Sequence, residues 1–413
     1  MKVRFDKKKL MEVLDPASSI SQTKNTLMTV DGLLFECPPD RNYGEYDVEN
    51  PDSCRISAFD LDKGMRACIE CEVIEPGAFV VNTQSIKQRI NILPEGNVDF
   101  DIDENGILKI VGGNTKYEVS TISADQFPSM PHFTGEKKYV MPQYKLRNVI
   151  SETVFSVAVN DQRAAFNGAF FQIKEGNLVV VGCDGQRLAA AKVRIGEDIE
   201  ETSFIVPKKF LTELVRMLED SEEEVTMMVG AKHVIFRFRN MYFFTRLIEA
   251  EYINFEKLLP KSYMTQAYVS KADFIAALER AAIVADEKTG GSSKSHVKLE
   301  FENNSIRMSA LSQDGSVNEK VPAAIDGQDL AIGFNCRFLL EALKSTPNEC
   351  DRIRIRMNTP LMGAIIEPAE GSSINETNPD SSVYGNRENR QNKVEDEEKG
   401  TFTYFVMPIK MNR

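Results

Sequence analysis

Side chains that could carry out catalysis are few in this sequence and form no known arrangement. His132, His233 and His296 stand far apart and make no HxxxH or HExxH pair of the kind that a zinc hydrolase needs. Gly290-Gly-Ser-Ser-Lys-Ser295 is similar to a phosphate-binding loop, but glycine is missing before the lysine and no strand pattern precedes the stretch. A Gly-x-Ser-x-Gly elbow does not occur. The residues therefore predict a protein that is not an enzyme.

One acidic stretch keeps a catalytic alternative open. Asp101-Ile-Asp-Glu-Asn-Gly106 fits the opening of a calcium-binding loop, but the twelfth position is Gly112 instead of glutamate. The flanking residues alternate like strands, so a hairpin with an Asn-Gly turn is the simpler interpretation. A metal-dependent phosphohydrolase that uses Asp99, Asp101 and Asp103 is the alternative function.

The cysteines predict neither a metal centre nor a disulfide framework. Cys68 and Cys71 have CxxC spacing, but no second pair accompanies them, so the spacing is interpreted as a chance pair on a strand. The seven cysteines are odd in number and scattered over the chain, which favours reduced thiols. No metal ion and no cofactor are expected.

The elements that position these residues follow a pattern that occurs three times. An apolar strand leads into an amphipathic helix, and a polar turn and an alternating strand follow. Ile86, Leu211 and Leu339 occupy the same helical position in the three copies and are spaced by 125 and 128 residues. The copies run over 79–93, 204–218 and 331–343, and the alternating strands begin at Val98, Val225 and Ile353.

A second amphipathic helix precedes each copy, over 6–14, 142–156 and 270–284. The chain thus repeats one plan of helix, strands, helix and strands, and a period of this length indicates a duplicated domain instead of a solenoid unit. The expected fold class is α+β, with domains at 1–133, 134–260 and 261–413.

Charge is distributed unevenly over these elements. The net charge of −12 and the absence of tryptophan argue, taken alone, against nucleic-acid binding. The six helical segments (those three with 83–93, 207–218 and 334–345) nevertheless carry 14 Lys and Arg against seven acids, which leaves −19 for the rest of the chain. If the helices share one surface, it is basic and suits phosphate contacts without base readout. The alternative is that the helices simply expose solvated lysines.

Several motifs carry a resemblance to a known family. They are Lys24-Asn-Thr-Leu27, Phe166-Asn-Gly168, 181–189 (VGCDGQRLA), 333–343 (GFNCRFLLEAL) and 404–411 (YFVMPIKM). Together, on a threefold repeat, they resemble the bacterial sliding clamp, the beta subunit of DNA polymerase III, and the similarity runs over the whole chain in one order.

The resemblance implies three clamp-type domains per chain, each with antiparallel sheets outside and two helices inside. Two chains would join head to tail into a homodimer that closes a six-domain ring around duplex DNA. The implied function is that of a non-catalytic processivity factor in DNA replication. Implied partners are double-stranded DNA without sequence specificity, the replicative polymerase, the clamp loader and other proteins with clamp-binding motifs. A clamp paralogue with a protective or repair role is the alternative within the family.

The resemblance also assigns residues. Those expected to face DNA in the hole are Lys7, Lys8, Lys9, Lys24, Lys87, Arg89, Lys145, Arg147, Lys208, Lys209, Arg216, Lys271, Arg280, Arg337 and Lys344. Those expected in a pocket for partner peptides are Phe166, Cys183, Gly185, Gln186, Arg187, Leu188, Ile253, Leu258, Asn335, Phe338, Met362, Met407, Pro408, Ile409, Lys410 and Met411. Those expected at the dimer interface are Ile86, Tyr117, Ile283 and Val284.

Some features depart from the family pattern or extend it. Ile253 stands where the family usually has proline, Gln186 replaces the more usual His or Tyr, and Asn412-Arg413 extend the ending, so peptide preference is open. Residues 38–52 are turn-rich and predict a long hairpin loop. Residues 371–400 are polar and predict a disordered insertion. No apolar run spans a membrane and the start shows no leader pattern, so a cytoplasmic, nucleoid-associated protein without membrane contact is expected.

Overall fold

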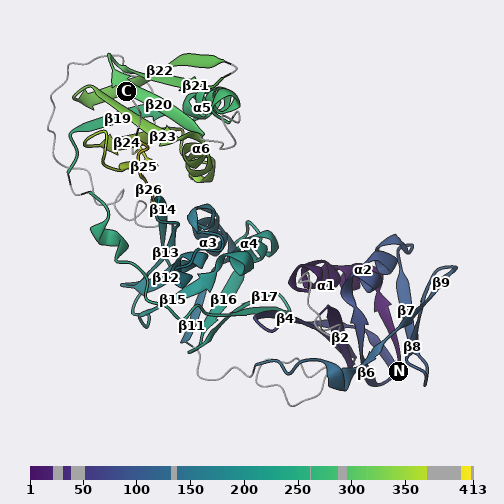
Figure 1. Ribbon diagram of the computed structural model, residues 1–413. Helices are drawn as coiled ribbons and strands as arrows, with labels where there is room; N and C mark the ends of the chain where they lie inside the picture. The colour runs from purple at the N-terminus through teal and green to yellow at the C-terminus, as the bar shows by residue number, and fades with distance from the viewer. Residues whose placement is uncertain are drawn as a thin grey trace. The chain divides into compact units, whose positions relative to one another are not determined.

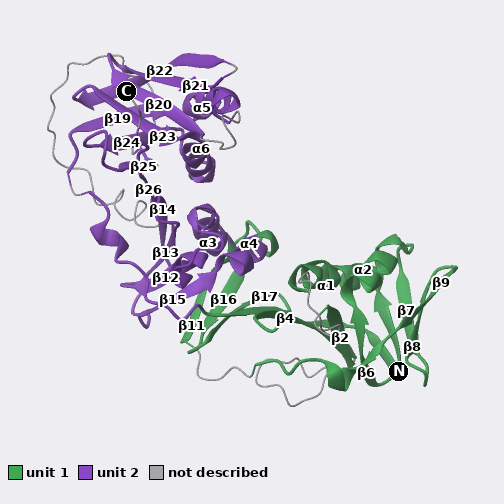
Figure 2. Ribbon diagram, viewed as in Figure 1, with its two compact units in different colours: residues 1–143, 216–247 green, residues 144–215, 248–413 purple. Residues whose placement is uncertain are grey.

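The computed structural model describes residues 1–21, 31–38, 52–131, 137–260, 262–286, 295–313, 315–369 and 401–410. They divide into two compact units, residues 1–143 with 216–247 and residues 144–215 with 248–413, and Figure 2 colours the units separately. The predicted insertion at 371–400 and nearly all of the predicted hairpin loop at 38–52 lie outside the described residues.

One order of elements is repeated three times along the chain (Figure 1), which confirms the plan predicted from the sequence. The first repeat contains β1 (Lys2–Asp6), α1 (Lys7–Ile20), β2 (Gly32–Cys37), β3 (Ser53–Phe59), β4 (Lys63–Glu70), β5 (Glu72–Glu75), β6 (Gly77–Asn82), α2 (Thr83–Ile92), β7 (Asn97–Ile102), β8 (Ile107–Gly112), β9 (Thr115–Ser120), β10 (Ile122–Ser123) and η1 (Ala124–Gln126). The second contains β11 (Lys137–Pro142), α3 (Gln143–Ser151), η2 (Val154–Ser156), η3 (Ala164–Asn167), β12 (Gly168–Lys174), β13 (Asn177–Cys183), β14 (Arg187–Arg194), β15 (Thr202–Pro207), α4 (Lys208–Met217), β16 (Glu224–Val229), β17 (His233–Phe238), β18 (Met241–Arg246) and η4 (Phe255–Lys257). The third contains β19 (Thr265–Ser270), α5 (Lys271–Ala285), β20 (His296–Glu302), β21 (Ser305–Leu311), β22 (Ser316–Gly327), β23 (Leu330–Asn335), α6 (Cys336–Ser345), β24 (Arg352–Met357), β25 (Ala364–Pro368) and β26 (Thr401–Val406).

The first unit contains two antiparallel sheets. One has the strand order β5-β1-β7-β8-β9, and the other has the order β10-β6-β2-β3-β4-β18-β17-β16-β11. The second sheet joins strands of the first repeat to strands of the second through the β4–β18 pair. Helices α1 and α2 pack against each other, and Leu10, Val13, Ile86 and Ile90 are buried beneath them. The apolar faces read from the sequence are therefore core faces.

In the second unit, one antiparallel sheet of twelve strands runs in the order β15-β12-β13-β14-β26-β25-β24-β19-β22-β21-β20-β23. The β14–β26 pair joins the second repeat to the third, with Leu188 opposite Phe405. Helices α5 and α6 pack together, and Phe274, Leu278, Leu339 and Leu343 are buried in their shared core. The unit thus holds strands and helices from two repeats in one sheet and its covering layer.

The helices begin where a polar side chain accepts the first free N–H groups. Asp6, Asn82, Ser270 and Asn335 each occupy the N-cap of a helix and accept backbone N–H bonds from residues two or three positions later. One helix is longer than expected, because α1 continues through Pro16 to Ile20. Burial of the residues beyond that proline, including Ala17 and Ile20, stabilises this last turn against the lost N–H.

The first residue of the first helix closes the end of the second helix in every repeat. The backbone N–H groups of Lys7, Gln143 and Lys271 donate to Gly96 O, Glu223 O and Asp351 O at 3.0, 2.8 and 2.9 Å. The side chains then meet the carboxyl end of the partner helix. Lys7 Nζ donates to Leu93 O at 2.6 Å, Lys271 Nζ donates to Thr346 O at 2.9 Å, and Gln143 Oε1 accepts from Glu219 N–H at 3.1 Å. Cations at these ends also complement the helix dipole.

The expectation that every cysteine is reduced is wrong for one pair. Cys37 and Cys54 form a disulfide, with Cα atoms 4.5 Å apart and a sequence separation of 17. They lie on the paired strands β2 and β3, and this closeness was not visible in the scattered sequence positions. Cys68, Cys71, Cys183, Cys336 and Cys350 are free thiols.

A carboxyl group at the end of α3 predicts a dependence of stability on pH. Burial, together with the nearby Glu349 carboxylate, raises the pKa of Glu152 from 4.5 to about 8. The folded state therefore binds a proton that the unfolded state releases above pH 4.5, so stability is highest below that pH and falls as pH rises toward 8. Replacing Glu152 with Gln is expected to remove this fall and to raise the free energy of unfolding at pH 8.5 by about 1–3 kcal/mol. Urea unfolding at pH 5 and pH 8.5 measures the free energy of unfolding of both proteins. If this free energy changed equally with pH in the wild type and in the Glu152→Gln protein, the prediction would be wrong.

Candidate functional site

An apolar cluster on the outer face of the second unit's sheet gathers many of the predicted pocket residues. Phe166, Cys183 and Leu188 of the second repeat are buried against Ile365 and Phe405 of the third. Partly buried residues of the connecting segment pack on this cluster, and they include Tyr252, Ile253, Leu259 and Tyr263. Motifs that are far apart in sequence thus form one surface, because β14 pairs with β26 and β26 with β25.

The rim of this cluster is exposed and apolar. Leu258, Leu361, Met362 and Met407 are large apolar side chains that remain exposed. Met362 and Met407 lie at the same end of the β25–β26 pair, since Ala364 is opposite Val406. Gly363, next to Met362 in sequence, allows the Phe405 ring to approach closely, because an added Cβ would lie 2.2 Å from Phe405 Cζ. Exposed methionines next to a buried apolar floor suit a binding site for apolar side chains of varied shape.

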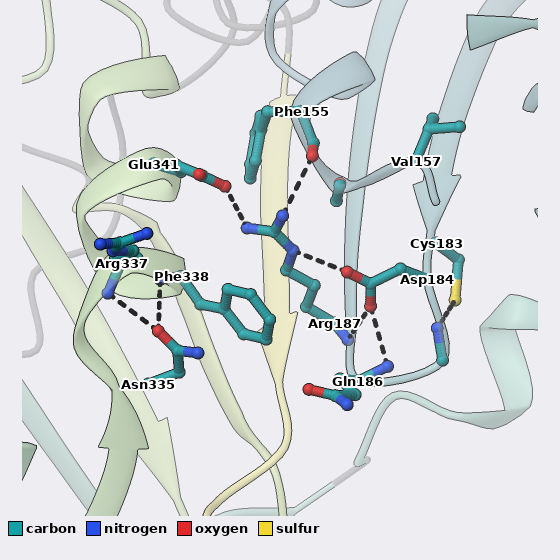
Figure 3. Close-up of polar contacts among 12 residues, drawn as sticks. Phe155, Val157, Cys183, Asp184, Gln186, Arg187, Asn335, Arg337, Phe338 and Glu341 are labelled. Atoms are coloured by element: carbon teal, nitrogen blue, oxygen red, sulfur yellow. Dashed lines mark hydrogen bonds and ion pairs between the residues drawn. The ribbon is translucent and has the colours of Figure 1, made fainter. Parts of the chain in front are cut away.

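Arg187 links the two repeats beside this cluster, as Figure 3 shows. Its side chain is only 9% exposed and forms ion pairs with Asp184, Nε to Oδ2 at 3.0 Å, and with Glu341 of α6. Its Nη2 donates to Phe155 O at 3.1 Å. The guanidinium also lies over the rings of Phe155 and Phe338, 5.5 and 4.0 Å from their centroids. One buried cation therefore holds β14 against α6.

Neighbouring groups complete this charged cluster. Lys208 Nζ donates to Val157 O at 2.6 Å, and burial followed by the nearby Arg187 charge lowers the pKa of Lys208. Tyr404 donates its hydroxyl to Phe338 O at 3.1 Å, and burial raises the pKa of Tyr404. Burial likewise raises the pKa of the Cys183 thiol, whose Sγ accepts the Gly185 N–H. The thiol is therefore protonated at neutral pH, and Cys183 packs in the apolar cluster as a neutral side chain.

The remaining predicted pocket residues take backbone or capping roles. Gln186 accepts the Met407 N–H at 2.9 Å, and Ile409 N–H donates to Gly333 O at 2.8 Å, which fixes the C-terminal segment across the repeats. Asn335 caps α6 by accepting from Arg337 and Phe338. Gly185 has a φ of +89° in the β13–β14 turn. Pro408 and Lys410 lie on the same C-terminal segment, and Met411 lies outside the described residues.

Sequence reasoning missed several residues that the structure brings to this site. Asp184 and Glu341 hold Arg187, and Phe155 stacks on it. Arg163 lies over the Phe166 ring at 4.0 Å and is held by Asp161 at 2.9 Å, an interaction that lowers the pKa of Asp161 to about 2. The spacing of Asp184 and Arg187 on a turn was a local signal, but Glu341 lies 154 residues from Arg187 and no pattern connects them.

The basic residues assigned to the hole fall into two classes. In the described part of the chain, Lys8, Lys209 and Arg216 are exposed, Arg147 is half-buried, and no carboxylate lies within ion-pair distance of the four. The others are bound to neighbouring groups. These are Lys9 with Glu70, Lys87 with Asp15, Arg89 with Ser85, Lys145 with Arg194 O, Arg280 with Glu319, Arg337 with Asp286 and Lys344 with Glu279. Lys24 lies outside the described residues.

Three of these assignments need correction. Lys7 is buried with its ammonium on Leu93 O and on Glu95, and Lys271 donates to the carbonyls of Thr346 and Pro347. Both side chains close helix ends, and each ammonium has two of its three donors bound within the fold. Lys208 is also turned inward, onto Val157 O. A basic residue on an amphipathic helix is ambiguous in sequence, because a capping lysine and a solvated lysine look alike.

Replacing Lys7 with Met tests this correction. Because the substitution leaves Leu93 O without its donor, the free energy of unfolding is expected to fall by about 1–3 kcal/mol. The salt dependence of DNA binding is expected to stay unchanged. Lys8→Met is the matched control, since this exposed neighbour should alter stability by less than about 0.5 kcal/mol and lower the salt slope by about 0.9. Urea unfolding and DNA titrations at several salt concentrations measure both, and the reverse pattern would restore Lys7 to the DNA-facing set.

The residues assigned to the dimer interface differ in exposure. Ile283 on α5 is 72% exposed, whereas Val284 is partly buried against the core of its own repeat. Tyr117 on β9 is half-buried and lies beneath the Arg89 guanidinium at 5.9 Å. The assignment of Ile86 needs correction, because it is 0% exposed within its own unit and offers no surface to a partner. Ile92, at the end of the same helix, is 70% exposed.

The acidic stretch of the hydrolase alternative has structural partners. Asp99 accepts from Arg4 at 2.6 Å, and Asp103 accepts the backbone N–H groups of Asn105 and Ile107 at 3.0 Å in the turn between β7 and β8. The predicted hairpin is therefore confirmed. Within the described ranges, three or more His, Cys, Asp or Glu side chains nowhere gather so that they could hold a metal ion. None of the helices described is both long and apolar enough to cross a membrane.

Comparisons with known proteins agree with this architecture. The family model described as "DNA polymerase III beta subunit, central domain" matches residues 140–254, and the model of the C-terminal domain matches residues 256–380. The Beta sliding clamp of Staphylococcus epidermidis is 28% identical over 305 residues, which cover 73% of this chain and 79% of the relative. That of Staphylococcus aureus is 28% identical over 304 residues, which cover 73% and 78%.

Solved structures show the same fold over the full length. The DNA polymerase sliding clamp from Bacillus subtilis superposes with a TM-score of 0.83 at 22% identity, and the beta subunit from Thermotoga maritima with 0.82 at 24%, each covering 100% of both chains. The two family models together match more than half of this sequence. The chain therefore belongs to the family of bacterial DNA polymerase III beta subunits, the sliding clamps.

Proposed function

We propose that two copies of this chain close a ring around duplex DNA and tether the replicative polymerase to it. Membership in the sliding clamp family, over a threefold repeat of one plan, carries this proposal. As a sliding clamp the protein is a non-catalytic processivity factor. A closed ring stays on DNA by topology, so its phosphate contacts can remain weak enough to permit sliding.

The proposed domains are residues 1–133, 134–260 and 261–413, and two chains would supply six of them. The threefold order of elements supports these limits, since each domain then contains two α-helices and their strands. The proposed contacts with DNA phosphates come first from Lys8, Arg147, Lys209 and Arg216, because their charges are not paired within the described chain. The proposed location is the cytoplasm, on the chromosome.

The apolar cluster is the proposed binding site for peptide segments of the polymerase, the clamp loader and other clamp-binding proteins. Its buried floor of Phe166, Leu188, Ile365 and Phe405 and its exposed methionine rim support this role. A preformed apolar pocket can receive one or two apolar anchor side chains of a short peptide. Ile253 and Gln186 shape the wall differently from the usual family residues, so we expect a changed preference among peptides.

Retention on circular DNA tests the proposed function. The protein would be loaded onto a primed circular duplex with a bacterial clamp loader and ATP, and the complex would be separated on a sizing column at high salt. A sliding clamp is expected to stay on the circle at high salt and to leave when the circle is cut, whereas binding by charge alone would be lost at high salt from both forms. Longer products in primer extension by a bacterial replicative polymerase would separate the replicative role from a protective one.

A further inference from the structure

We propose that a row of arginines on the third repeat, Arg352, Arg354 and Arg356, forms a second subsite for partner peptides and binds acidic residues that flank the apolar anchor. The inference rests on the proposed peptide-binding role of the apolar cluster. It adds that the partner peptide must carry acidic residues and that these must stand at a defined distance from its apolar anchor.

The alternation of β24 separates the arginines from the core. Ile353, Ile355 and Met357 are buried beneath α5 and α6. Successive side chains of a strand point to opposite faces, so Arg352, Arg354 and Arg356 share the outer face of the sheet. The same face holds the apolar cluster, because Ile365 and Phe405 of that cluster alternate with the core residues Ile366 and Tyr404.

The cluster formed by these three arginines and Glu367 is positive although the chain is acidic. Glu367 accepts from Arg354 Nε at 2.7 Å and from Arg356 Nη2 at 2.8 Å, so one carboxylate serves two guanidinium groups. With Arg352, the four side chains carry a net charge of +2. Asp326 lies two strands away and is bound by Gln266 at 3.0 Å. Outside the helical segments the rest of the chain is strongly acidic, which makes this cluster a local exception.

The arginines retain capacity to bind a second carboxylate. The side chains of Arg354 and Arg356 are 31% and 24% exposed, while Glu367 between them is 11% exposed. A guanidinium offers several N–H donors in a planar fork, and one shared carboxylate cannot satisfy two such forks. An acidic side chain of a ligand would complete them.

A continuous row of residues leads from the apolar cluster to the arginines. Leu188 is opposite Phe405, Phe405 is opposite Ile365, and Ile365 is opposite Arg356, in the strand order β14-β26-β25-β24. Residues directly opposite in antiparallel strands share a face. Tyr263 bridges the two regions, since it packs on the cluster while Arg356 lies over its ring at 4.2 Å.

This row fixes the spacing that a ligand must have. Three strand steps of about 4.8 Å separate Leu188 from Arg356, or roughly 14 Å. An extended peptide covers that distance in roughly four to five residues, at about 3.3 Å each. The occupant is therefore a partner peptide with an apolar anchor and, four to five residues away, two or more acidic side chains.

Fluorescence anisotropy with labelled synthetic peptides tests the proposal on the full-length protein. One probe carries Leu-Phe, a Gly-Ser spacer of four residues and three Glu, and a second has Gln in place of each Glu; both are made in either chain direction. At 50 mM salt the Glu peptide is expected to bind about 5-fold more tightly, and most of this difference is expected to vanish at 500 mM salt.

Arg352→Gln is expected to remove about half of the preference for Glu without changing binding of the Gln peptide, because this arginine is not bound to Glu367. Arg356→Gln combined with Glu367→Gln avoids a buried unpaired carboxylate and should remove most of the rest. Arg307→Gln is the control, since Arg307 is an exposed arginine of the same repeat paired with Glu302 on β20. The Arg307→Gln protein should prefer the Glu peptide to the same extent as the wild type.

The outcomes separate this inference from the proposed function. Equal binding of both peptides by wild type and variants would overturn the arginine subsite while leaving the apolar site in place. Binding of neither peptide would instead contradict the peptide-binding role itself. The chain also contains the acidic run Glu395-Asp-Glu-Glu398. A further outcome is that the wild type shows no preference for the Glu peptide, whereas a full-length variant with amides at those four positions shows it. The occupant of the arginine subsite would then be this chain's own segment, and the proposal of a partner peptide would be wrong.

Discussion

Replacing Arg187 with methionine is expected to lower the free energy of unfolding by about 3–4 kcal/mol and to weaken binding of apolar peptides by more than about 10-fold. The substitution removes one buried cation and leaves Asp184 Oδ2 and the Phe155 carbonyl without their guanidinium donors, while Asp184 Oδ1 keeps the backbone N–H groups of Gln186 and residue 187. Methionine keeps much of the volume between the Phe155 and Phe338 rings, so the effect reports the lost charge and hydrogen bonds instead of a cavity.

Peptide binding should suffer because Arg187 joins the two walls of the site. Its ion pair with Glu341 attaches α6 of the third repeat to β14 of the second. Without that link the apolar floor, made from both repeats, has to be ordered by the ligand itself, which costs binding free energy. Calorimetry with the apolar Gln-containing peptide and urea unfolding measure the two effects.

Two variants control for less specific causes. Arg194→Met removes a more exposed arginine that is paired with Glu197 on the same repeat, and should cost less than about 1 kcal/mol. Arg187→Met combined with Glu341→Gln removes one of the carboxylates left behind and should recover part of the loss. An Arg187→Met protein with unchanged stability would show that the buried pair contributes nothing.

Periodicity was sufficient to predict the architecture, because each helix buries an apolar stripe that repeats at helical spacing. The strands that begin at Val98, Val225 and Ile353 were found because they alternate and keep register between copies. The end of α1 was not predicted from the sequence. A proline inside a helix is tolerated only when packing beyond it is favourable, and packing is a property of the folded chain.

Motifs predicted the members of the candidate site but not the interactions that hold it together. Leu188 and Phe166 could be assigned by resemblance, whereas the pairing of Arg187 with Glu341 depends on strands that meet only after folding. Gln143 stands at the position that Lys7 and Lys271 occupy in the other two repeats, a signal that the sequence contains but that was not used when both lysines were assigned to the hole. An amide can replace an ammonium at a helix end, where hydrogen bonding decides, but not at a phosphate, where charge decides.

Replacing Ile283 with aspartate is expected to convert the proposed dimer into a monomer without unfolding the chain. Ile283 is 72% exposed, so the substitution should cost the monomer less than about 0.5 kcal/mol. In a head-to-tail ring of two chains the same contact occurs twice. Losing a buried isoleucine and burying a carboxylate at each contact should cost about 3 kcal/mol, and two contacts weaken association by roughly 10⁴-fold.

Light scattering on a sizing column at micromolar concentration measures this result. The wild type is expected at twice 46.5 kDa and the Ile283→Asp protein at 46.5 kDa. Leu311→Asp is the matched control, because Leu311 is 83% exposed on the same repeat and has no assigned role in the interface. It should remain dimeric, since loss of the dimer there would reflect surface charge in general. A wild type that stays monomeric at every concentration could not close the ring, and retention on circular DNA would then need another explanation than topology.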